Sequence, residues 1–220
     1  MKKVAVFDFD KTLISGDSGF AFFLWQIKSS MFKTYIVGLT LPLWSLFLLI
    51  PSLNHQVLKV LAWVAMLNVN KKTIKSVLRD FYHSYSESGK LIFYDEAINR
   101  LKKHRLQEDK IIILSAAPSW LVRYILKEKG IRVDKIIASK GHFTFCSIWM
   151  KHHCYGKHKV VMAKQKNESV SQWFYGYSDS VSDFPFLNMC QYQYLINSNR
   201  KLKKIARLRF KDTVSFEEWS

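Results

Sequence analysis

The sequence predicts an α/β fold built on a parallel β-sheet, and three observations support this prediction. Residues 4–7 form an apolar run that is short enough to be a strand buried on both faces of such a sheet. Further along the chain, apolar runs of similar length alternate with segments of helical periodicity, which is typical of βαβ units. A chain of 220 residues is also long enough to bury a sizeable core. The predicted strands are 4–7, 110–114, 134–139, 173–177 and 192–196.

Helical segments are predicted between and after these strands. Asp17 precedes the first of them and is interpreted as part of its N-cap. Gly89 separates two helices in the middle of the chain, and Gly130 ends a third. Residues 141–154 alternate weakly between apolar and polar and predict a hairpin. The predicted helices are 19–28, 71–88, 94–105, 119–130 and 200–211.

The chain is strongly basic, with 34 Lys and Arg against 17 Asp and Glu, a formal net charge of +17 and a pI near 9.8. Such a surface favours an anionic partner, and nucleic acid, an anionic membrane and a phosphorylated substrate all satisfy that condition. The three cysteines are odd in number and have no paired spacing, which is typical of a reducing compartment. The chain begins directly with the first predicted strand, so we expect no signal peptide and a cytoplasmic protein.

Two carboxylates, Asp8 and Asp10, follow the first strand at a spacing of two, so both side chains should leave the strand end on one side. Buried negative charge at the C-terminal edge of an open α/β sheet needs a cationic partner. Oxygen ligands with no imidazole or thiolate nearby favour Mg²⁺ over zinc or copper. The pair therefore predicts a Mg²⁺ ion with open positions for water and a phosphate group.

Positions further along the chain extend this pattern. Ser115 follows the second predicted strand, where a small hydroxyl residue and free N–H groups before a helix can hold phosphate oxygens. Lys159 lies near the start of a helix, and Lys157 is the alternative lysine. Asp179 and Asp183 follow the fourth strand at a spacing of four, so both can face the first aspartate pair.

The segment DFDKT resembles the DxDxT motif of the haloacid dehalogenase-like superfamily of aspartyl-phosphate phosphohydrolases. Ser115 fits the second motif, CYGKHK resembles the CxGxxK segment with Lys159 at its lysine, and GYSDSVSD resembles the fourth motif. The last two are most similar to the phosphoserine-phosphatase-like subclass IB. The resemblance implies a Rossmann-like parallel sheet formed by residues 1–16 and 106–220. It also implies an all-helical cap, residues 17–105, inserted between the first and second motifs.

The resemblance further implies a role for each residue in phosphomonoester hydrolysis. Asp8 attacks phosphorus to form an aspartyl phosphate, and Asp10 protonates the leaving group and then activates water. Lys159 neutralises the nucleophile and the phosphoryl oxygens, and Asp183 anchors either the water shell of the metal or this lysine. Mg²⁺ would be held by Asp8, Asp10 and Asp179, and the phosphate group by Ser115, Ala116 and Thr12.

Two departures from the family pattern bear on the substrate. Lys11 stands where the family more usually has Gly, which adds a positive side chain near the site. A soluble phosphoserine phosphatase of this subclass typically has a glutamate soon after the first motif, whereas the first glutamate here is Glu87. This difference argues against a small amino-acid substrate.

Residues 34–58 contain no Asp, Glu, Lys or Arg and are the most unusual stretch outside the motifs. A single membrane crossing is excluded, because it would place two halves of one active site on opposite sides of the membrane. The segment therefore lies in a membrane interface, forms a helical hairpin with 56–69, or is a buried helix of a soluble cap. Its tryptophan and the flanking lysines favour membrane contact. The long apolar cap is most similar to that of phosphatidylglycerophosphatase C, a membrane-associated lipid phosphatase.

We therefore expect a Mg²⁺-dependent phosphatase that acts on a membrane phospholipid such as phosphatidylglycerol phosphate, at the cytoplasmic face of the inner (plasma) membrane. The alternative is the same chemistry on a soluble, phosphoserine-like phosphate or on a polyprenyl-linked phosphate, the soluble version being cytoplasmic. A noncatalytic basic module that binds lipid or nucleic acid has less support, because binding alone needs no four acidic positions at strand ends. The basic helix 200–211 either lies on lipid, binds nucleic acid or packs on the domain edge.

Overall fold

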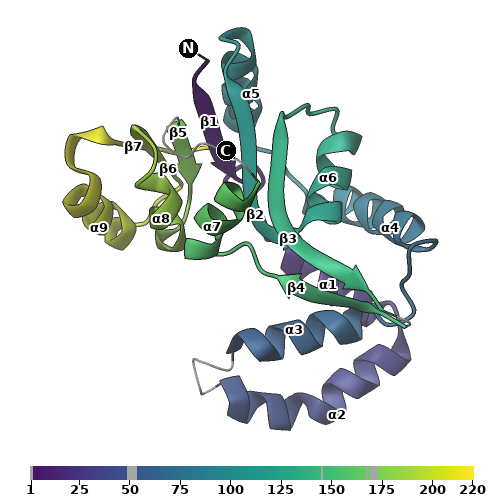
Figure 1. The fold of residues 1–220 in the computed structure, drawn as a ribbon. Coiled ribbons are helices and arrows are strands. Elements are labelled where there is room, and N and C mark those ends of the chain that lie inside the picture. Colours follow the sequence, from purple (N-terminus) through teal and green to yellow (C-terminus); the bar gives the residue numbers. More distant parts are fainter. Residues whose placement is uncertain (1, 49–53, 145, 167, 169–172) are drawn as a thin grey trace.

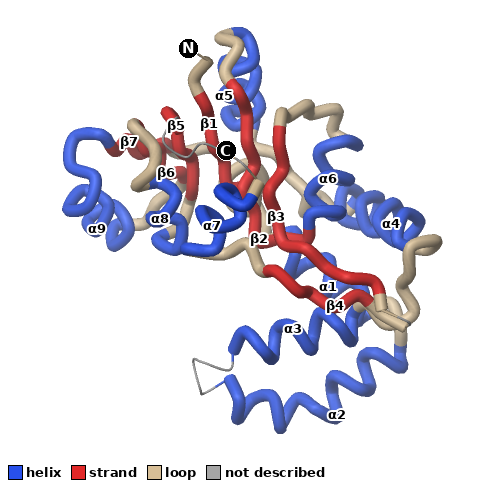
Figure 2. Tube along the Cα trace, in the orientation of Figure 1, coloured by secondary structure: helices blue, strands red, loops and turns tan. Residues whose placement is uncertain are grey.

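A central sheet carries helices on both faces, and a further group of helices lies beyond the C-terminal edge of its parallel strands (Figure 1). The computed structural model describes residues 2–48, 54–144, 146–166, 168 and 173–220, and between residues 41 and 58 it describes no side chains. Figure 2 shows the strands gathered in the middle of the molecule, with the helices around them. The edge where the parallel strands end therefore faces the outlying helices.

In the described residues the sheet has the strand order β4-β3-β2-β1-β5-β6-β7, and every neighbouring pair is parallel except β3 with β4. The first strand lies at the centre, so its C-terminal end is flanked by those of β2 and β5. All five predicted strands are present, and the predicted α/β fold with a mostly parallel sheet is confirmed. The strands are β1 Val4–Asp8, β2 Lys110–Pro118, β3 Lys135–Phe143, β4 Ile148–His152, β5 Trp173–Ser178, β6 Tyr192–Ile196 and β7 Val214–Glu217.

Strand β1 is buried at every position, and residues 4–7 are apolar because both faces of the strand are covered by helices. Ala5 and Phe7 point into a core shared with helices α1, α4, α5 and α6. Val4 and Val6 point into a second core under α7, α8 and α9. The helices are α1 Ser18–Lys28, α2 Met31–Leu48, α3 Asn54–Ala65, α4 Ile74–Glu87, α5 Asp95–Leu106, α6 Ser119–Glu128, α7 Lys157–Gln165, α8 Phe184–Leu187 and α9 Arg200–Phe210.

Helix α5 and strand β7 add detail to the sequence-based expectation. Helix α5 overlaps the range 17–105 predicted for the cap, and its buried residues Ala97 and Leu101 share one core with residues of α1, α4 and the sheet. Strand β7 was not predicted, because its four residues carry little pattern of their own and pair in parallel only with β6. The predicted hairpin at 141–154 is present, formed by the end of β3 and by β4.

Helices α2 and α3 lie side by side in the outlying layer (Figure 1). The buried ammonium of Lys33 on α2 donates a hydrogen bond to the carbonyl oxygen of Ala65 at the end of α3, at 2.7 Å. Residues 49–53 of the predicted apolar segment lie outside the described residues. Within the described ranges, the structure contains no helix with both the length and the apolar character needed to span a membrane.

The β3–β4 hairpin joins the sheet to these outlying helices. Its buried Ser147 donates a hydrogen bond from Oγ to the carbonyl oxygen of Trp63 on α3, at 2.7 Å. The backbone N–H of Asn68, just after α3, donates to the carbonyl oxygen of Cys146, also at 2.7 Å. Because the hairpin is part of the sheet, these bonds hold α3 over the ends of the parallel strands.

A buried polar network lies between α5 and the sheet. Nδ1 of His104 lies 2.9 Å from a carboxylate oxygen of Asp109, and Nε2 lies 2.8 Å from the hydroxyl of Tyr177. Arg100 also donates to this hydroxyl, at 3.2 Å. The ring of Tyr177 stacks on Phe7, with ring centroids 4.2 Å apart. Burial lowers the pKa of His104, although the hydrogen bond to Asp109 acts in the opposite direction.

We predict that His104 makes the free energy of unfolding depend on pH. Folding lowers its pKa, so the unfolded chain binds the proton more readily and stability is lost as the pH falls below the ordinary value near 6.5. The variant His104→Gln has no charge to gain, so its melting temperature should fall less between about pH 7 and pH 5. Thermal unfolding of both proteins across this range measures the difference, and parallel curves would contradict the prediction.

Candidate active site

A cavity of about 460 Å³ opens at the C-terminal ends of β1, β2 and β5. The carboxyl ends of parallel strands meet at one edge of the sheet, which is where open α/β folds place their ligands. The sequence predicts that the acidic residues and the lysine share one cavity, and the structure places them in its lining. The lining includes the predicted residues Asp8, Asp10, Ala116, Lys159, Asp179 and Asp183.

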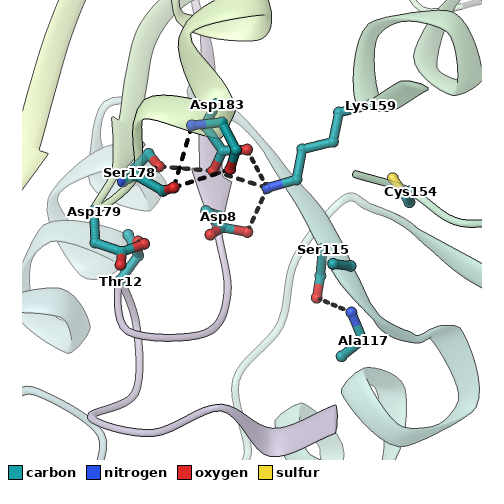
Figure 3. Close-up of polar contacts among 12 residues, drawn as sticks. Asp8, Thr12, Ser115, Ala117, Cys154, Lys159, Ser178, Asp179 and Asp183 are labelled. Atoms are coloured by element: carbon teal, nitrogen blue, oxygen red, sulfur yellow. Dashed lines mark hydrogen bonds and ion pairs between the residues drawn. The ribbon is translucent and has the colours of Figure 1, made fainter. Parts of the chain in front are cut away.

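The ammonium of Lys159 lies between two carboxylates at the base of this cavity (Figure 3). Its Nζ donates to Asp8 at 2.7 Å and to Asp183 at 2.8 Å. The hydroxyl of Ser178 donates to the same carboxylate of Asp183, at 2.7 Å. Burial by itself would lower the pKa of Lys159, but the charges of Asp8 and Asp183 outweigh it and raise that pKa above its ordinary value. The lysine therefore stays charged.

The local backbone selects Lys159 over the alternative Lys157. Gly156 precedes α7 with φ at +54°, a conformation that favours glycine, and the helix begins at the next residue. Lys157 at the start of the helix is exposed, whereas Lys159 is only 2% exposed and faces the sheet. Lys157 and Lys159 differ in exposure because residues two positions apart on an α-helix point to nearly opposite sides of it.

Asp10 occupies a different environment from Asp8. Its Oδ1 accepts a hydrogen bond from the backbone N–H of Ser18, at the start of α1, at 2.6 Å. Burial raises the pKa of Asp10 to about 7, although the hydrogen bond with Ser18 lowers it. The carboxyl of Asp10 can therefore hold or release a proton near neutral pH.

Lys11, the next residue, has φ of +57°, so a residue other than glycine adopts the left-handed conformation here.

Asp8 and Asp179 are also shifted toward their protonated forms. Burial raises the pKa of Asp8 well above its ordinary range; Lys159 opposes this shift, and the nearby carboxylates of Asp183 and Asp179 add to it. Burial and the charge of Asp183 raise the pKa of Asp179. The hydroxyl of Thr12 lies 3.5 Å from an oxygen of Asp179. Burial is therefore the main cause of both shifts, and neighbouring carboxylates add to it.

Ser115 and Thr12 are fully buried, and neither is among the described residues that line the cavity. The hydroxyl oxygen of Ser115 accepts a hydrogen bond from the backbone N–H of Ala117, at 3.0 Å. Strand β2 continues past Ser115 to Pro118 because it pairs again with β3 after a bulge. Ala116 within this bulge does line the cavity. The phosphate-binding roles of Ser115, Ala116 and Thr12 stay predictions.

The donor set fits Mg²⁺ in its chemistry. Five carboxylates line the cavity against three lysines, Lys11, Lys59 and Lys159, so acidic side chains are in excess, and oxygen ligands suit this ion. In the described residues, no three His, Cys, Asp or Glu side chains are already arranged around one metal position. One oxygen of Asp8 is engaged with Lys159 and one oxygen of Asp10 with Ser18. Asp8, Asp10 and Asp179 are the residues that would hold the ion.

Sequence reasoning did not identify the side walls of the cavity. Asp17 was predicted to cap α1, and its carboxylate does accept from the N–H of Phe20 at 2.8 Å. The walls come from three separate regions, so no local pattern marks them as neighbours. The aromatic residues of the first predicted helix and of the hairpin were the only feature of the sequence that could have indicated these walls. These wall residues are Phe20 and Phe23 of α1, Lys59 and Ala62 of α3, Met150 of β4, and His153 and Tyr155 after β4.

Comparison with solved structures shows the same fold. A protein of unknown function from Bordetella pertussis Tohama I has a TM-score of 0.76 at 18% identity, covering 98% of this chain and 99% of that chain. A substrate-bound phosphoserine phosphatase has a TM-score of 0.57 at 12% identity, covering 93% of this chain and 90% of that chain. At these identities the similarity establishes the fold alone.

Sequence relatives are also distant. A protein described as a probable phosphatase from Mycobacterium tuberculosis is 22% identical over 98% of this chain and 76% of its own length. The inhibition of morphological differentiation protein of Streptomyces azureus is 24% identical over 94% of this chain and 76% of its own length. Residues 5–188 match the family of haloacid dehalogenase-like hydrolases. This match spans most of the chain and includes all four motifs, so the chain belongs to the haloacid dehalogenase-like hydrolases.

Proposed function

We propose that this phosphatase uses Mg²⁺ and an aspartyl-phosphate intermediate to remove the phosphoryl group from a membrane phospholipid such as phosphatidylglycerol phosphate. The observation that carries the chemistry is the pairing of Asp8, held by Lys159 at 2.7 Å, with Asp10, whose pKa is raised to about 7, in one cavity. One carboxylate is oriented as a nucleophile, and the other can give and take a proton at neutral pH.

The reaction divides into two displacements at phosphorus. In the first, an oxygen of Asp8 forms a bond to phosphorus, the bond to the leaving oxygen breaks, and Asp10 donates its proton to that oxygen. In the second, a water molecule loses a proton to Asp10 and attacks phosphorus, which breaks the bond to Asp8 and releases inorganic phosphate. Both carboxylates return to their starting states, so the cycle is balanced.

The surrounding charges allow two anions to approach each other. The ammonium of Lys159 reduces the repulsion between Asp8 and the phosphoryl oxygens, and Asp183 fixes its position. A bound Mg²⁺ would supply the remaining positive charge that the excess of carboxylates requires. The relative described as a probable phosphatase supports this chemistry for the chain.

The walls of the cavity support a substrate with an apolar part. Phe20, Phe23, Ala62 and Met150 line it, and Phe20 is 64% exposed, so the apolar wall continues to the outer surface. A volume of about 460 Å³ suits a headgroup-sized molecule and cannot also contain two acyl chains. In the proposed complex the headgroup enters the cavity, and the chains stay outside along this wall.

The outer face of α2 supports contact with an anionic membrane. Met31, Tyr35 and Leu39 recur every four residues on this helix and are 92%, 68% and 66% exposed. No Asp or Glu occurs between Asp17 and Asp80, whereas lysines flank the apolar run. An apolar face with cationic neighbours suits an interface between lipid and water. This face supports the membrane contact in the proposal that the enzyme acts at the cytoplasmic face of the inner membrane.

A second candidate is hydrolysis of a soluble phosphomonoester such as phosphoserine. The similarity of the fold to phosphoserine phosphatase favours it. Against it, the carboxylates of the cavity lie at the strand ends and the start of α1, and none of the described wall residues from α3 or the hairpin is acidic. A protonated amino group would therefore lack a partner in these walls.

The proposed chemistry predicts Mg²⁺-dependent release of phosphate from a lipid. In detergent micelles the enzyme should release inorganic phosphate from phosphatidylglycerol phosphate faster than from phosphoserine. Removal of divalent ions with EDTA should abolish turnover, and added Mg²⁺ should restore it. A colorimetric phosphate assay with matched substrate concentrations measures both effects. Efficient cleavage of phosphoserine with no cleavage of the lipid would favour the soluble candidate.

The variant Asp8→Asn should lose turnover by a factor of about 10³ or more, because the amide cannot form the phosphoryl bond. Its melting temperature should stay close to that of the unchanged protein, because Lys159 keeps its contact with Asp183. The control is Asp212→Asn, which removes an exposed carboxylate of the C-terminal region. Appreciable turnover by Asp8→Asn would exclude this residue as the nucleophile.

The membrane contact is tested with vesicles. The unchanged protein should sediment with vesicles that contain anionic lipid, and the double variant Met31→Ser, Leu39→Ser should bind roughly tenfold more weakly. The matched control is Leu106→Ser, whose side chain is 85% exposed on α5, away from α2. Equal loss of binding in the control, or no binding by the unchanged protein, would refute the contact through α2.

A further inference from the structure

The carboxylates of the cavity come from one part of its lining. Its five described carboxylates, those of Asp8, Asp10, Asp17, Asp179 and Asp183, come from the loops at the strand ends and from the start of α1. A second wall comes from α3 and from the segment that follows β4, and its described residues include no carboxylate. A substrate whose phosphoryl group lies among the carboxylates can extend its leaving group toward this second wall.

The second wall has cationic and aromatic character. Lys59 of α3 lies in the lining, together with the rings of His153 and Tyr155. These two rings stack with centroids 5.6 Å apart and planes within 8° of parallel, so they present a continuous aromatic surface. The polar groups of this wall are an ammonium, an imidazole and a phenol, all of which can donate a hydrogen bond to an anion.

The position of Lys59 is supported by contacts outside the cavity. Helix α3 is held to the β3–β4 hairpin through the bond from Ser147 to Trp63, one turn beyond Lys59. The hairpin also leads into His153 and Tyr155, so both sides of this wall are fixed to each other. A wall held in this way can recognise a group at a defined place on the substrate.

We propose that Lys59, His153 and Tyr155 form a subsite for a second, anionic group on the leaving group of the substrate. This inference rests on the proposed phosphatase activity and narrows its substrate class. The enzyme then prefers phosphomonoesters whose leaving group carries a negative charge, such as a phosphodiester. It discriminates against leaving groups that carry an ammonium, because Lys59 repels them and no described carboxylate of this wall compensates.

Short soluble substrates separate this subsite from membrane contact. We would compare three-carbon phosphomonoesters whose far end is a methyl group, an ammonium or a methyl phosphodiester. The unchanged enzyme should show a kcat/KM about tenfold higher for the phosphomonoester that ends in a phosphodiester than for the one that ends in a methyl group. One charge-assisted contact contributes roughly this factor. The ammonium ester should be the poorest of the three.

The variant Lys59→Gln should lose about five- to tenfold in kcat/KM for the substrate that ends in a phosphodiester. For the substrate that ends in a methyl group, its kcat/KM should stay within about twofold of that of the unchanged enzyme. The loss should appear in KM, because the contact is present before the chemical step. The matched control is Lys75→Gln, which removes an exposed lysine of α4 outside the cavity lining. Melting temperatures of both variants check that the fold is retained.

The outcomes distinguish this inference from the proposed function. Equal losses on all three esters, or no charge preference in the unchanged enzyme, would overturn the subsite while leaving the phosphatase intact. If the unchanged enzyme hydrolyses phosphatidylglycerol phosphate but none of the short esters, the subsite is also overturned, because it should bind the phosphodiester without a membrane. Absence of hydrolysis of every phosphomonoester would instead overturn the proposed function.

Discussion

The contact of one buried ammonium with two carboxylates organises the catalytic end of this protein. Lys159 reaches from α7 to Asp8 at the end of β1 and to Asp183 beyond β5, so three separate segments depend on one charge. Charges this deeply buried are tolerated only when they are paired and hydrogen bonded. Asp10 and Asp179 lie in the same cavity, and burial is the main cause of the raised pKa values of both, with the nearby carboxylates of Asp17 and Asp183 adding to it. A bound cation would favour the charged forms of these carboxylates, which is the role proposed for Mg²⁺.

The parts of the site that lie at strand ends were predictable from the sequence, because strand periodicity and the carboxyl edge of a parallel sheet fix where such side chains go. Asp8 follows a run buried on both faces, and Asp179 follows another that pairs directly with it. Lys159 was predictable because CYGKHK resembles the CxGxxK segment of the family, in which the lysine stands three residues after the glycine. In each case a short sequence pattern marks the residue, and the position of the pattern beside a strand or helix indicates where the side chain lies.

The walls were not predictable, because they depend on contacts between segments far apart in the chain. Lys59 and Tyr155 line one cavity only because the β3–β4 hairpin is bonded to α3. Helix α5 shows the same limit. Its helical period was evident, yet its place on the sheet depends on the buried contact of His104 with Tyr177, which no local pattern encodes. The packing of this helix therefore could not be predicted from its position along the chain.

The positive charge of the whole chain and the chemistry of the site act at different ranges. A net charge of +17 attracts any polyanion, so by itself it selects no substrate. Near the cavity, excess carboxylates at the strand ends repel a phosphate unless a cation intervenes, while the wall that contains Lys59 attracts a negative group. Only a molecule that brings negative charge to both places, with a divalent ion at one of them, satisfies the two regions together. In this proposal, selectivity arises from opposite local charges inside the cavity of a chain whose net charge is positive.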